Sequence, residues 1–519
     1  MDTSTLEAVI RTHGRGRPDA TLGIFDGRPV TYGAMHERSS RVGNGLRAEG
    51  LKPDSRVAIL SKNEAAVFEV LFGARKTGAV QVAVNWRLSA DEMQYIVADS
   101  GAETLFVGDG FLEQAKSIAE KLPSLRKVIA LGEDPGPFEG YEAWLAKQSP
   151  EDPGFSSQPD DVALQLYTSG TTGRPKGAML MNRNIFAFIS AAHRALGSDP
   201  DGVYLNCLPL FHVGGVNWAL QAFALGAHVI IFRDFDADAL VAAIEKRRVT
   251  HMITVPAVIQ ALLARPLARS TDFSSLRVAG YGGSSISETL LRDAIATFGN
   301  CLHGMYGSTE LSFAVTLLSP AEHVTAEHPE WLRSCGRTLP GSEIRVLDPV
   351  TLTDVAEGVT GEIWVQSPQR GLGYWKQAEA TGHTFRSDGW FRTGDLGHVV
   401  DGYLYLSDRL NDMIISGGEN VYPAEIERVL GEHPDVAQVV AFGVPDVKWG
   451  EAAHAVVVRA PNATPDPEAL LEYVRERLAH YKCPRAITFA EALPMTASGK
   501  VQRAQLRAPF WEGHTRRIA

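Results

Sequence analysis

The chain has 519 residues, and a guide value of about 150 residues per domain predicts about three domains or subdomains. Apolar residues make up 45% of the chain and charged residues 21%, which is ordinary for a globular protein and argues against a disordered one. The formal net charge is −11 and no basic stripe is present, so nucleic acid is not expected as a partner.

Cysteine spacing and hydropathy predict a cytoplasmic protein without a membrane span. The cysteines lie far apart with no Cys-x-x-Cys pair, which predicts free thiols in a reducing compartment. They are Cys207, Cys301, Cys335 and Cys483. The start, MDTSTLEAVI, lacks the basic and apolar regions of a signal peptide. The most apolar stretch, residues 216–232, contains Asn217, Gln221 and His228, which favours a buried core over a membrane span.

In chain order, short β-branched runs alternate with helical patterns through the first four hundred residues. Strands are predicted at 57–60, 80–84, 228–231 and 251–255, and helices at 90–101 and 236–249. This alternation predicts a large N-terminal domain of layered α/β sheets, mostly parallel.

From Glu343 the pattern changes. Strands with Gly-rich turns at 343–348, 361–367 and 397–408 predict a small β-rich subdomain. After Asp408 come strands at 438–443 and 453–460 and an amphipathic helix in 465–481, which predict a small α+β C-terminal domain. The helix is expected to bury one face made of Leu470, Leu471, Val474 and Leu478. The predicted division is an N-terminal domain at 1–408, a hinge at 409–412 and a C-terminal domain at 413–519.

The segment YTSGTTGRPKG, residues 167–177, combines glycines and small hydroxyl residues with one cation, Lys176. Backbone N–H groups of such a loop can converge on an anion, which predicts a phosphate-binding loop. It is not a Walker A loop, because Lys176 is followed by Gly177 and the glycine spacing differs. Taken alone, the segment could equally be a surface loop.

Further motifs follow in order: LPLFHVGG (208–215), GYGGSS (280–285), MYGSTE (305–310), WFRTGDLG (390–397), DRLNDMIISGGENVYPAEIE (408–427) and PMTASGKVQR (494–503). With the phosphate loop, this set resembles the adenylate-forming superfamily of acyl- and aryl-CoA synthetases, firefly luciferases and peptide-synthetase adenylation domains. The resemblance implies that a carboxylate attacks the α-phosphate of Mg-ATP, giving an acyl-adenylate and pyrophosphate. A thiol, usually that of coenzyme A, then displaces AMP. It also implies a C-terminal domain that moves between the two steps.

The resemblance assigns the nucleotide site. Glu310 is expected to bind Mg²⁺, because hard cations take carboxylate oxygens. Asp395 is the expected ribose ligand, because a carboxylate can accept both ribose hydroxyls. The expected ATP- or AMP-binding residues are Thr168, Ser169, Gly170, Thr171, Thr172, Gly173, Lys176, Gly283, Ser284, Ser285, Tyr306, Gly307, Ser308, Thr309, Asp395 and Arg409.

Three residues match catalytic positions. Lys500 matches the family's catalytic lysine, which approaches the carboxylate and the α-phosphate for adenylation and then leaves. His212 matches an aromatic gate between ATP and the acyl tunnel, although a core histidine is the alternative. Thr309 is expected to reach the α-phosphate.

The acceptor and acyl sites are also assigned by resemblance. The expected coenzyme A residues are Gly214, Gly215, Gly417, Gly418 and Trp449. The expected acyl pocket is apolar and consists of Val216, Trp218, Val255, Tyr281, Gly282, Met305 and Phe313, which predicts an uncharged acyl tail. Bulky Trp218 favours a short, medium or aryl acid over a long one. Phe211 and His212 stand where amino-acid-activating relatives carry an Asp, which disfavours an amino-acid substrate.

The sequence departs from the family pattern at the hinge, where Asn411 replaces Asp or Lys. Asn tolerates unusual backbone torsions, so hinge action can survive. The leading hypothesis is an acid:CoA ligase that uses ATP, Mg²⁺, coenzyme A and a small carboxylic acid. The alternatives are transfer to a carrier-protein thiol and, less favoured, a non-catalytic nucleotide-binding paralogue. A homodimer is compatible with the sequence, which does not determine the oligomeric state.

Overall fold

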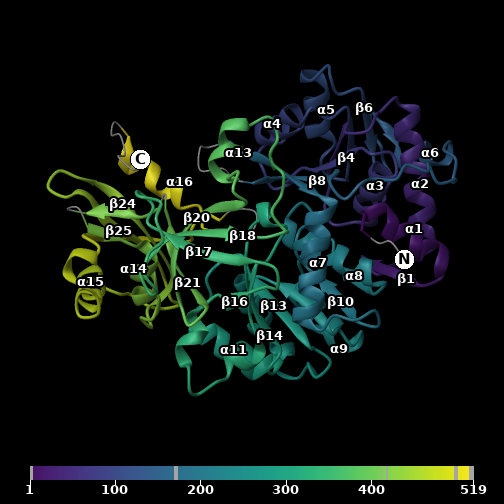
Figure 1. The fold of residues 1–519 in the computed structure, drawn as a ribbon. Coiled ribbons are helices and arrows are strands. Elements are labelled where there is room, and N and C mark those ends of the chain that lie inside the picture. The colour runs from purple at the N-terminus through teal and green to yellow at the C-terminus, as the bar shows by residue number, and fades with distance from the viewer. Residues whose placement is uncertain (1–3, 169–173, 411, 417–418, 496–500, 513–519) are drawn as a thin grey trace.

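A computed structural model describes residues 4–168, 174–410, 412–416, 419–495 and 501–512. Layered sheets with helices between and around them form most of the molecule (Figure 1). Ser169–Gly173, Asn411, Gly417, Gly418 and Lys500, which carry several of the predictions above, lie outside the described residues.

The first sheet carries the strand ends on which most of the site is built. Its strands run in the order β16 (Arg337–Thr338), β15 (Thr316–Leu318), β14 (Leu302–Tyr306), β13 (Val278–Gly282), β12 (His251–Thr254), β10 (Val203–Asn206), β11 (His228–Ile231), β1 (Thr21–Phe25) and β2 (Arg28–Thr31). Neighbouring strands from β14 to β1 are parallel. Their carboxyl ends therefore share one edge, where ligands of such sheets bind.

The second sheet carries the strands on either side of the predicted phosphate loop. Its order is β19 (Gly373–Tyr374), β9 (Lys176–Met181), β8 (Val162–Thr168), β4 (Val80–Ala83), β3 (Arg56–Leu60), β5 (Thr104–Val107), β6 (Lys127–Ala130) and β7 (Glu139–Gly140). From β8 to β7 the pairs are parallel, whereas β8 and β9 form an antiparallel hairpin around the loop. The predicted α/β layering with mostly parallel sheets is confirmed.

Helices cover and separate these two sheets. They are α1 (Leu6–Gly16), α2 (Tyr32–Ala48), α3 (Ala65–Arg75), α4 (Ala90–Ser100), α5 (Leu112–Lys121), α6 (Tyr141–Ala146), α7 (Asn182–Leu196), α8 (Val213–Leu225), α9 (Ala237–Lys246), α10 (Pro256–Leu263), α11 (Glu288–Phe298) and α12 (Pro320–His323). Helix α8 is buried from Val213 to Phe223, within a core that takes residues from both sheets. The apolar stretch 216–232 is thus α8 and β11, and no described helix is long and apolar enough to cross a membrane.

The predicted β-rich subdomain is an antiparallel sheet in the order β17 (Glu343–Leu347), β18 (Gly361–Gln366), β20 (Trp390–Val400) and β21 (Tyr403–Arg409). Helix α13 (Ala378–Thr384) packs beside it. Strand β21 ends at the predicted hinge, so this sheet joins the α/β body to the last part of the chain.

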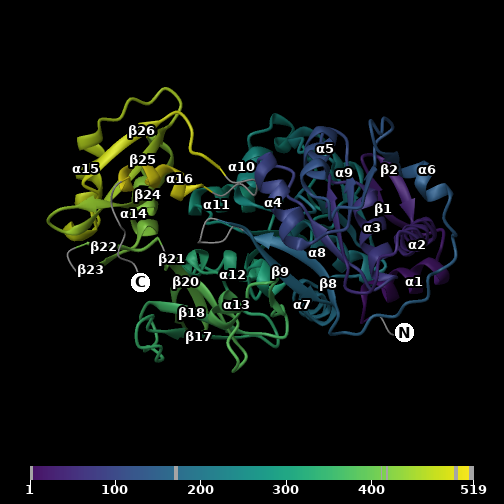
Figure 2. The same ribbon diagram turned by 90° about the horizontal axis from the view of Figure 1, so that it is seen from above.

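The last part of the chain lies beside the α/β body and has a core of its own (Figure 2). Its sheet contains β23 (Glu419–Val421), β22 (Ile414–Ser416), β25 (Gly450–Arg459), β24 (Val436–Asp446) and β26 (Ala486–Ala490). Helices α14 (Pro423–Gly431), α15 (Pro467–Arg475) and α16 (Arg503–Arg507) accompany it. The expected α+β class of this region is confirmed.

One predicted element is shorter than expected. Helix α15 ends at Arg475, because the N–H groups of Arg477 and Leu478 both return to the Val474 carbonyl and the backbone becomes extended at Ala479. Leu478 still packs against the core of this region from beyond the helix end. The apolar pattern correctly predicted burial of Leu478, but it did not show where the helix stops.

Candidate functional site

A carboxylate, a phenol and a guanidinium meet at the ends of β14, β20 and β21. Tyr306 donates its phenolic hydrogen bond to Asp395 Oδ2 at 2.7 Å. Arg409 lies opposite Asp395 across the β20–β21 ladder, and its Nε is 3.3 Å from Asp395 Oδ1. Burial and the Asp395 carboxylate raise the pKa of Tyr306 well above its ordinary value of 10.0, so the phenol remains a donor. Sequence reasoning predicted all three residues, and the structure brings them together.

A second polar group surrounds Glu310, just after β14. Glu310 Oε1 accepts hydrogen bonds from the hydroxyl of Thr168 at 3.4 Å and from that of Tyr374 at 2.9 Å. Lys176 Nζ lies 5.2 Å from the centre of the Tyr374 ring. The strand β8 that leads into the phosphate loop and the strand β9 that follows it therefore both reach the expected metal ligand.

Sequence reasoning missed Tyr374. It stands 64 positions from Glu310, in a GYWK segment that belongs to none of the motifs found in the sequence. Only the pairing of β19 with β9, which places Tyr374 opposite Ala178, brings its phenol to the site.

The two polar groups are parts of one site. Tyr306 ends β14 and Glu310 follows it in a short turn, and Arg409 interacts electrostatically with both Asp395 and Glu310. The Asp395 carboxylate is the main cause that raises the pKa of Arg409. A cation, two carboxylates and hydroxyl donors thus converge at this edge of the first sheet.

Close backbone packing explains why the MYGSTE segment contains a glycine, Gly307. A Cβ on Gly307 would lie 1.8 Å from the Phe313 carbonyl oxygen, so only glycine fits. The chain then turns through Ser312 at φ 58° and Phe313 at φ 132°, which are strained torsions for residues with a side chain. The Ser308 hydroxyl is buried, and no described group hydrogen-bonds to it. Strain and an unpaired polar atom of this kind often occur at ligand sites.

The GYGGSS segment lies at the end of β13. Gly282 is close-packed, since a Cβ there would lie 2.3 Å from the Met305 carbonyl. Gly283, at φ 79°, Ser284 and Ser285 are exposed and make no described contact with Asp395 or Glu310. Their expected place beside the adenine stays a prediction.

His212 caps the buried helix α8. Its Nδ1 accepts a hydrogen bond from the Gly214 N–H at 3.2 Å. A Cβ on Gly215 would lie 2.3 Å from the Pro209 carbonyl, and one on Gly214 would lie 3.3 Å from the Phe313 ring. Backbone packing therefore requires glycine at Gly215, whereas a Cβ on Gly214 would need only small shifts of neighbouring side chains. The expected contact of both glycines with coenzyme A stays a prediction.

The predicted acyl-pocket residues divide into separate groups. Val255, Met305 and Phe313 are half-buried and pack against the core that contains α8. Tyr281 lies in a different core, where its hydroxyl is 2.9 Å from His323 Nε2. Trp218 is fully buried, with its ring 5.7 Å from that of Tyr204, and Val216 is buried in the same core. Val255, Met305 and Phe313 are thus partly exposed at this core, whereas Val216, Trp218 and Tyr281 are buried. The expected acyl pocket and the effect of Trp218 on its length stay predictions.

Trp449, in the last part of the chain, is 37% exposed, and the ammonium of Lys448 lies 4.6 Å from its ring. The Arg485 guanidinium lies 5.8 Å from the same ring. The Trp449 side chain is therefore partly exposed to solvent rather than packed in a core. Its expected contact with coenzyme A stays a prediction.

No cluster of three or more His, Cys, Asp or Glu side chains able to hold a metal occurs among the described residues. Glu310 offers one carboxylate, which suits Mg²⁺ that arrives with substrate phosphates, since Mg²⁺ is usually held by one or two carboxylates together with phosphate and water oxygens. The donor set at Glu310 therefore fits Mg-ATP better than a resident metal ion.

Comparison with known proteins agrees with this geometry. Residues 10–375 match the AMP-binding enzyme family, and residues 425–500 match the AMP-binding enzyme C-terminal domain. The chain is 38% identical to the fatty acid–[acyl-carrier-protein] ligase ScoC of Streptomyces coeruleorubidus, over 99% of this chain and 98% of that protein. It is 37% identical to the indoleacetate–CoA ligase of Aromatoleum aromaticum, over 97% of each chain.

A solved structure shares the whole architecture. ATP-bound MatB from Rhodopseudomonas palustris has a TM-score of 0.89 and 29% identity, and the match covers 99% of this chain and 100% of that one. The shared fold, the two family matches and the polar site at the strand ends lead to one conclusion. The chain belongs to the AMP-binding enzyme family of ATP-binding, adenylate-forming enzymes, and it is an AMP-forming acid–thiol ligase.

Proposed function

We propose that this protein activates a carboxylic acid with Mg-ATP and transfers the acyl group to the thiol of coenzyme A. The observation that carries the proposal is the convergence of Asp395, Tyr306 and Arg409 with Glu310 and Lys176 at one edge of the first sheet. Carboxylates that can accept ribose hydroxyls and bind a cation, next to a lysine for phosphate, suit a nucleotide triphosphate.

The first step brings a carboxylate anion to a polyanion, so charge neutralisation is its main requirement. Lys176 faces the phosphates, and Glu310 would hold Mg²⁺, which neutralises phosphate charge when bound. Asp395 fixes the ribose while Thr309 reaches the α-phosphate. Lys500 then approaches the acid and the α-phosphate from the C-terminal domain, beyond a hinge at 409–412.

The second step exposes the adenylate to a thiol. In the proposed division, with domains at 1–408 and 413–519, rotation at Asn411 removes Lys500 from the site. Gly417 and Gly418 then form one wall of the acceptor channel, and Gly214 and Gly215 form the other. His212 stands between the nucleotide and the acyl group, and Trp449 borders coenzyme A.

The acid is proposed to have an uncharged tail, because Val255, Met305 and Phe313 present apolar surface. Two relatives carry names that refer to fatty acids and to indoleacetate, which supports a fatty or aryl acid. A carrier-protein thiol is the second candidate acceptor, since the relative ScoC is named as an acyl-carrier-protein ligase.

Acid-dependent AMP release, measured with and without coenzyme A over short, medium, long and aryl acids, tests the proposal. We expect release that requires coenzyme A together with one class of acid. If acids support only pyrophosphate exchange and the adenylate stays bound, the carrier-protein alternative replaces coenzyme A. Absence of any acid-dependent AMP release or pyrophosphate exchange would contradict the proposal as a whole.

Asp395→Ala should raise the KM for ATP by about 10-fold or more, because loss of a charged hydrogen-bond acceptor costs about 1.5–3 kcal/mol. The sharper test compares ATP with 2′-deoxy-ATP. The wild type should prefer ATP, whereas the variant should use both nucleotides almost equally, since the group that recognises the hydroxyl is gone. Asp401→Ala, at an exposed turn between β20 and β21, is the control and should keep the preference. An unchanged preference in Asp395→Ala would exclude a ribose role.

A further inference from the structure

Tyr374 contacts two oppositely charged groups of the site at once. Its hydroxyl donates to Glu310 Oε1 at 2.9 Å, and Lys176 Nζ lies 5.2 Å from the centre of its ring. The side chain is only 8% exposed, so water does not replace these contacts. One aromatic side chain therefore contacts both the lysine expected at the phosphates and the carboxylate expected at the metal ion.

This arrangement keeps the two charges from pairing with each other. Within the described parts of the chain, neither Lys176 nor Glu310 has an oppositely charged group within 4.0 Å, and Arg409 acts on Glu310 only from a longer distance. A lysine and a glutamate side by side at a partly buried site attract each other strongly and would neutralise one another. The Tyr374 ring offers Lys176 a weaker cation–π contact, and its hydroxyl offers Glu310 a hydrogen bond. Both ions stay available to partners of opposite charge.

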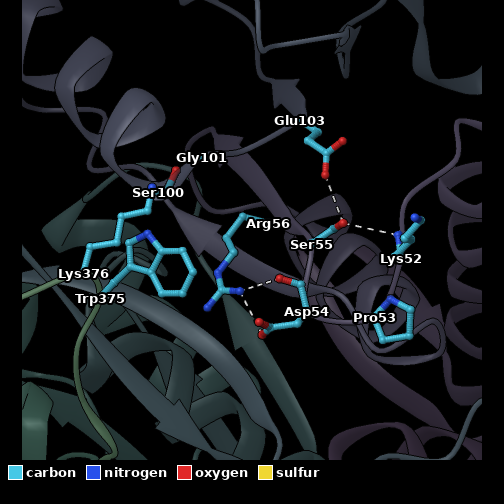
Figure 3. Close-up of a pocket in the computed structure, with 10 residues that line it drawn as sticks. All are labelled: Lys52, Pro53, Asp54, Ser55, Arg56, Ser100, Gly101, Glu103, Trp375 and Lys376. Carbon is cyan, nitrogen blue, oxygen red and sulfur yellow. Dashed lines mark hydrogen bonds and ion pairs between the residues drawn. The ribbon is translucent and has the colours of Figure 1, made fainter.

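The neighbouring residue holds Tyr374 in place. The Trp375 indole Nε1 donates to the Asp99 carbonyl at 3.0 Å, and the Arg56 guanidinium stacks on the indole at 3.7 Å from its centre (Figure 3). Lys376, at φ 54°, also reaches the Asp99 carbonyl, at 3.2 Å. Trp375 is half-buried in the turn that directly follows β19, so its fixed indole limits the movement of the adjacent, buried Tyr374.

The segment is also tied to the phosphate loop. The Trp375 N–H donates to the Gly177 carbonyl at 2.8 Å, directly after Lys176. On the other side of the loop, Tyr167 donates to Asp99 Oδ2 at 2.6 Å. The end of helix α4 therefore holds both the strand that enters the loop and the segment that carries Tyr374.

We propose that Tyr374 is a positioning residue that separates Lys176 from Glu310 and orients the Glu310 carboxylate for Mg²⁺ bound with ATP. This inference rests on the proposed function. In the hydrogen bond between them, the Tyr374 hydroxyl is the donor and the Glu310 carboxylate the acceptor, because an ionised carboxylate can only accept.

The test is calorimetric titration of the full chain with ATP, in excess Mg²⁺ and in EDTA. Tyr374→Phe keeps the ring and removes the hydroxyl. It should bind ATP in EDTA within about 2-fold of wild type but lose about 10-fold or more of the affinity gained with Mg²⁺, as expected for a hydrogen bond to a charged group. Tyr374→Leu also removes the ring, so Lys176 should pair with Glu310 and ATP affinity in EDTA should fall about 10-fold. Glu310→Gln added to Tyr374→Leu should restore that affinity.

Tyr403→Phe is a matched control. It removes a tyrosine–glutamate hydrogen bond of similar length, from Tyr403 to Glu322 Oε1 at 2.7 Å, outside the site. It should leave ATP affinity unchanged in both buffers. If Tyr374→Phe lowers affinity equally with and without Mg²⁺, or not at all, Tyr374 does not orient Glu310 and the proposal is overturned. Wild type that binds Mg-ATP but shows no acid-dependent AMP release would instead contradict the proposed function.

Discussion

Lys500→Ala should slow formation of the acyl-adenylate by about 100-fold or more, while leaving thioester formation from a supplied acyl-adenylate within about 3-fold of wild type. Removing one preorganised charge-stabilising donor typically costs about 10²–10³ in rate. Adenylation needs a cation between the carboxylate and the α-phosphate, whereas displacement of AMP by a thiol does not, provided that the C-terminal domain rotates Lys500 away. The variant should therefore lose the first half-reaction and keep the second.

The measurement follows acid-dependent pyrophosphate exchange for the first half and AMP release from synthetic acyl-adenylate plus coenzyme A for the second. Lys246→Ala, on the exposed side of helix α9, is the control and should change neither. An equal loss in both halves would show that Lys500 stays in the site throughout, which would refute the proposed two-state use of the C-terminal domain.

Arg503→Ala should destabilise the last part of the chain by about 3–5 kcal/mol, the usual cost of removing one partner from a buried ion pair. The Arg503 guanidinium lies 2.8 Å from Asp412, 3.3 Å from Asp408 and 2.7 Å from Glu427. Asp408 lies in β21 of the preceding sheet, Asp412 is the last residue of the predicted hinge, and Glu427 lies beyond the hinge in α14. Without Arg503, three carboxylates would face each other with Arg507, 3.3 Å from Asp412, as the nearest remaining cation.

Hydrogen–deuterium exchange of strands β22, β24 and β25 measures this effect, because lost stability appears as faster exchange of their amides. Arg428→Ala removes an exposed pair with Glu432 in α14 and should cost about 0.5 kcal/mol or less. If both variants exchange alike, the Arg503 cluster does not hold the hinge region together.

The Arg503→Ala defect should also depend on pH. Burial raises the pKa of Asp408 from 3.8 to about 6, so the folded state holds this proton more tightly than the unfolded state does. The resulting stabilisation is complete below about pH 4 and is lost as pH rises through about 6. Lowering the pH from 7 to 5 should therefore shrink the difference between variant and wild type, because one uncompensated charge disappears.

Several parts of the site could be predicted because they depend on short stretches of chain. Tyr306, Glu310, Asp395 and Arg409 stand in motifs whose residue types already suit ribose, phosphate and metal ligands, and the structure places them together. The apolar run 216–232 was correctly interpreted as core, since its polar residues interrupt any membrane span.

Other features could not be predicted from the sequence, because they depend on contacts between residues that are far apart in the chain. Tyr374 reaches Glu310 only because β19 adds to β9, and Arg503 meets Asp408 over 95 positions. Tyr281 belongs to a different core from Met305, although the motifs that contain them seemed equally suited to an acyl pocket.

By itself, the sequence determined the α/β class, the family and the chemistry of the nucleotide site. Periodicity of 2 or 3.6 residues and small motifs are local properties, written in a few neighbouring positions. The tertiary structure alone decided which residue contacts both Lys176 and Glu310, where α15 ends and which core each apolar side chain joins. These outcomes depend on strand pairing and on the sheet face that each side chain occupies, and neither is encoded in any single stretch of the chain.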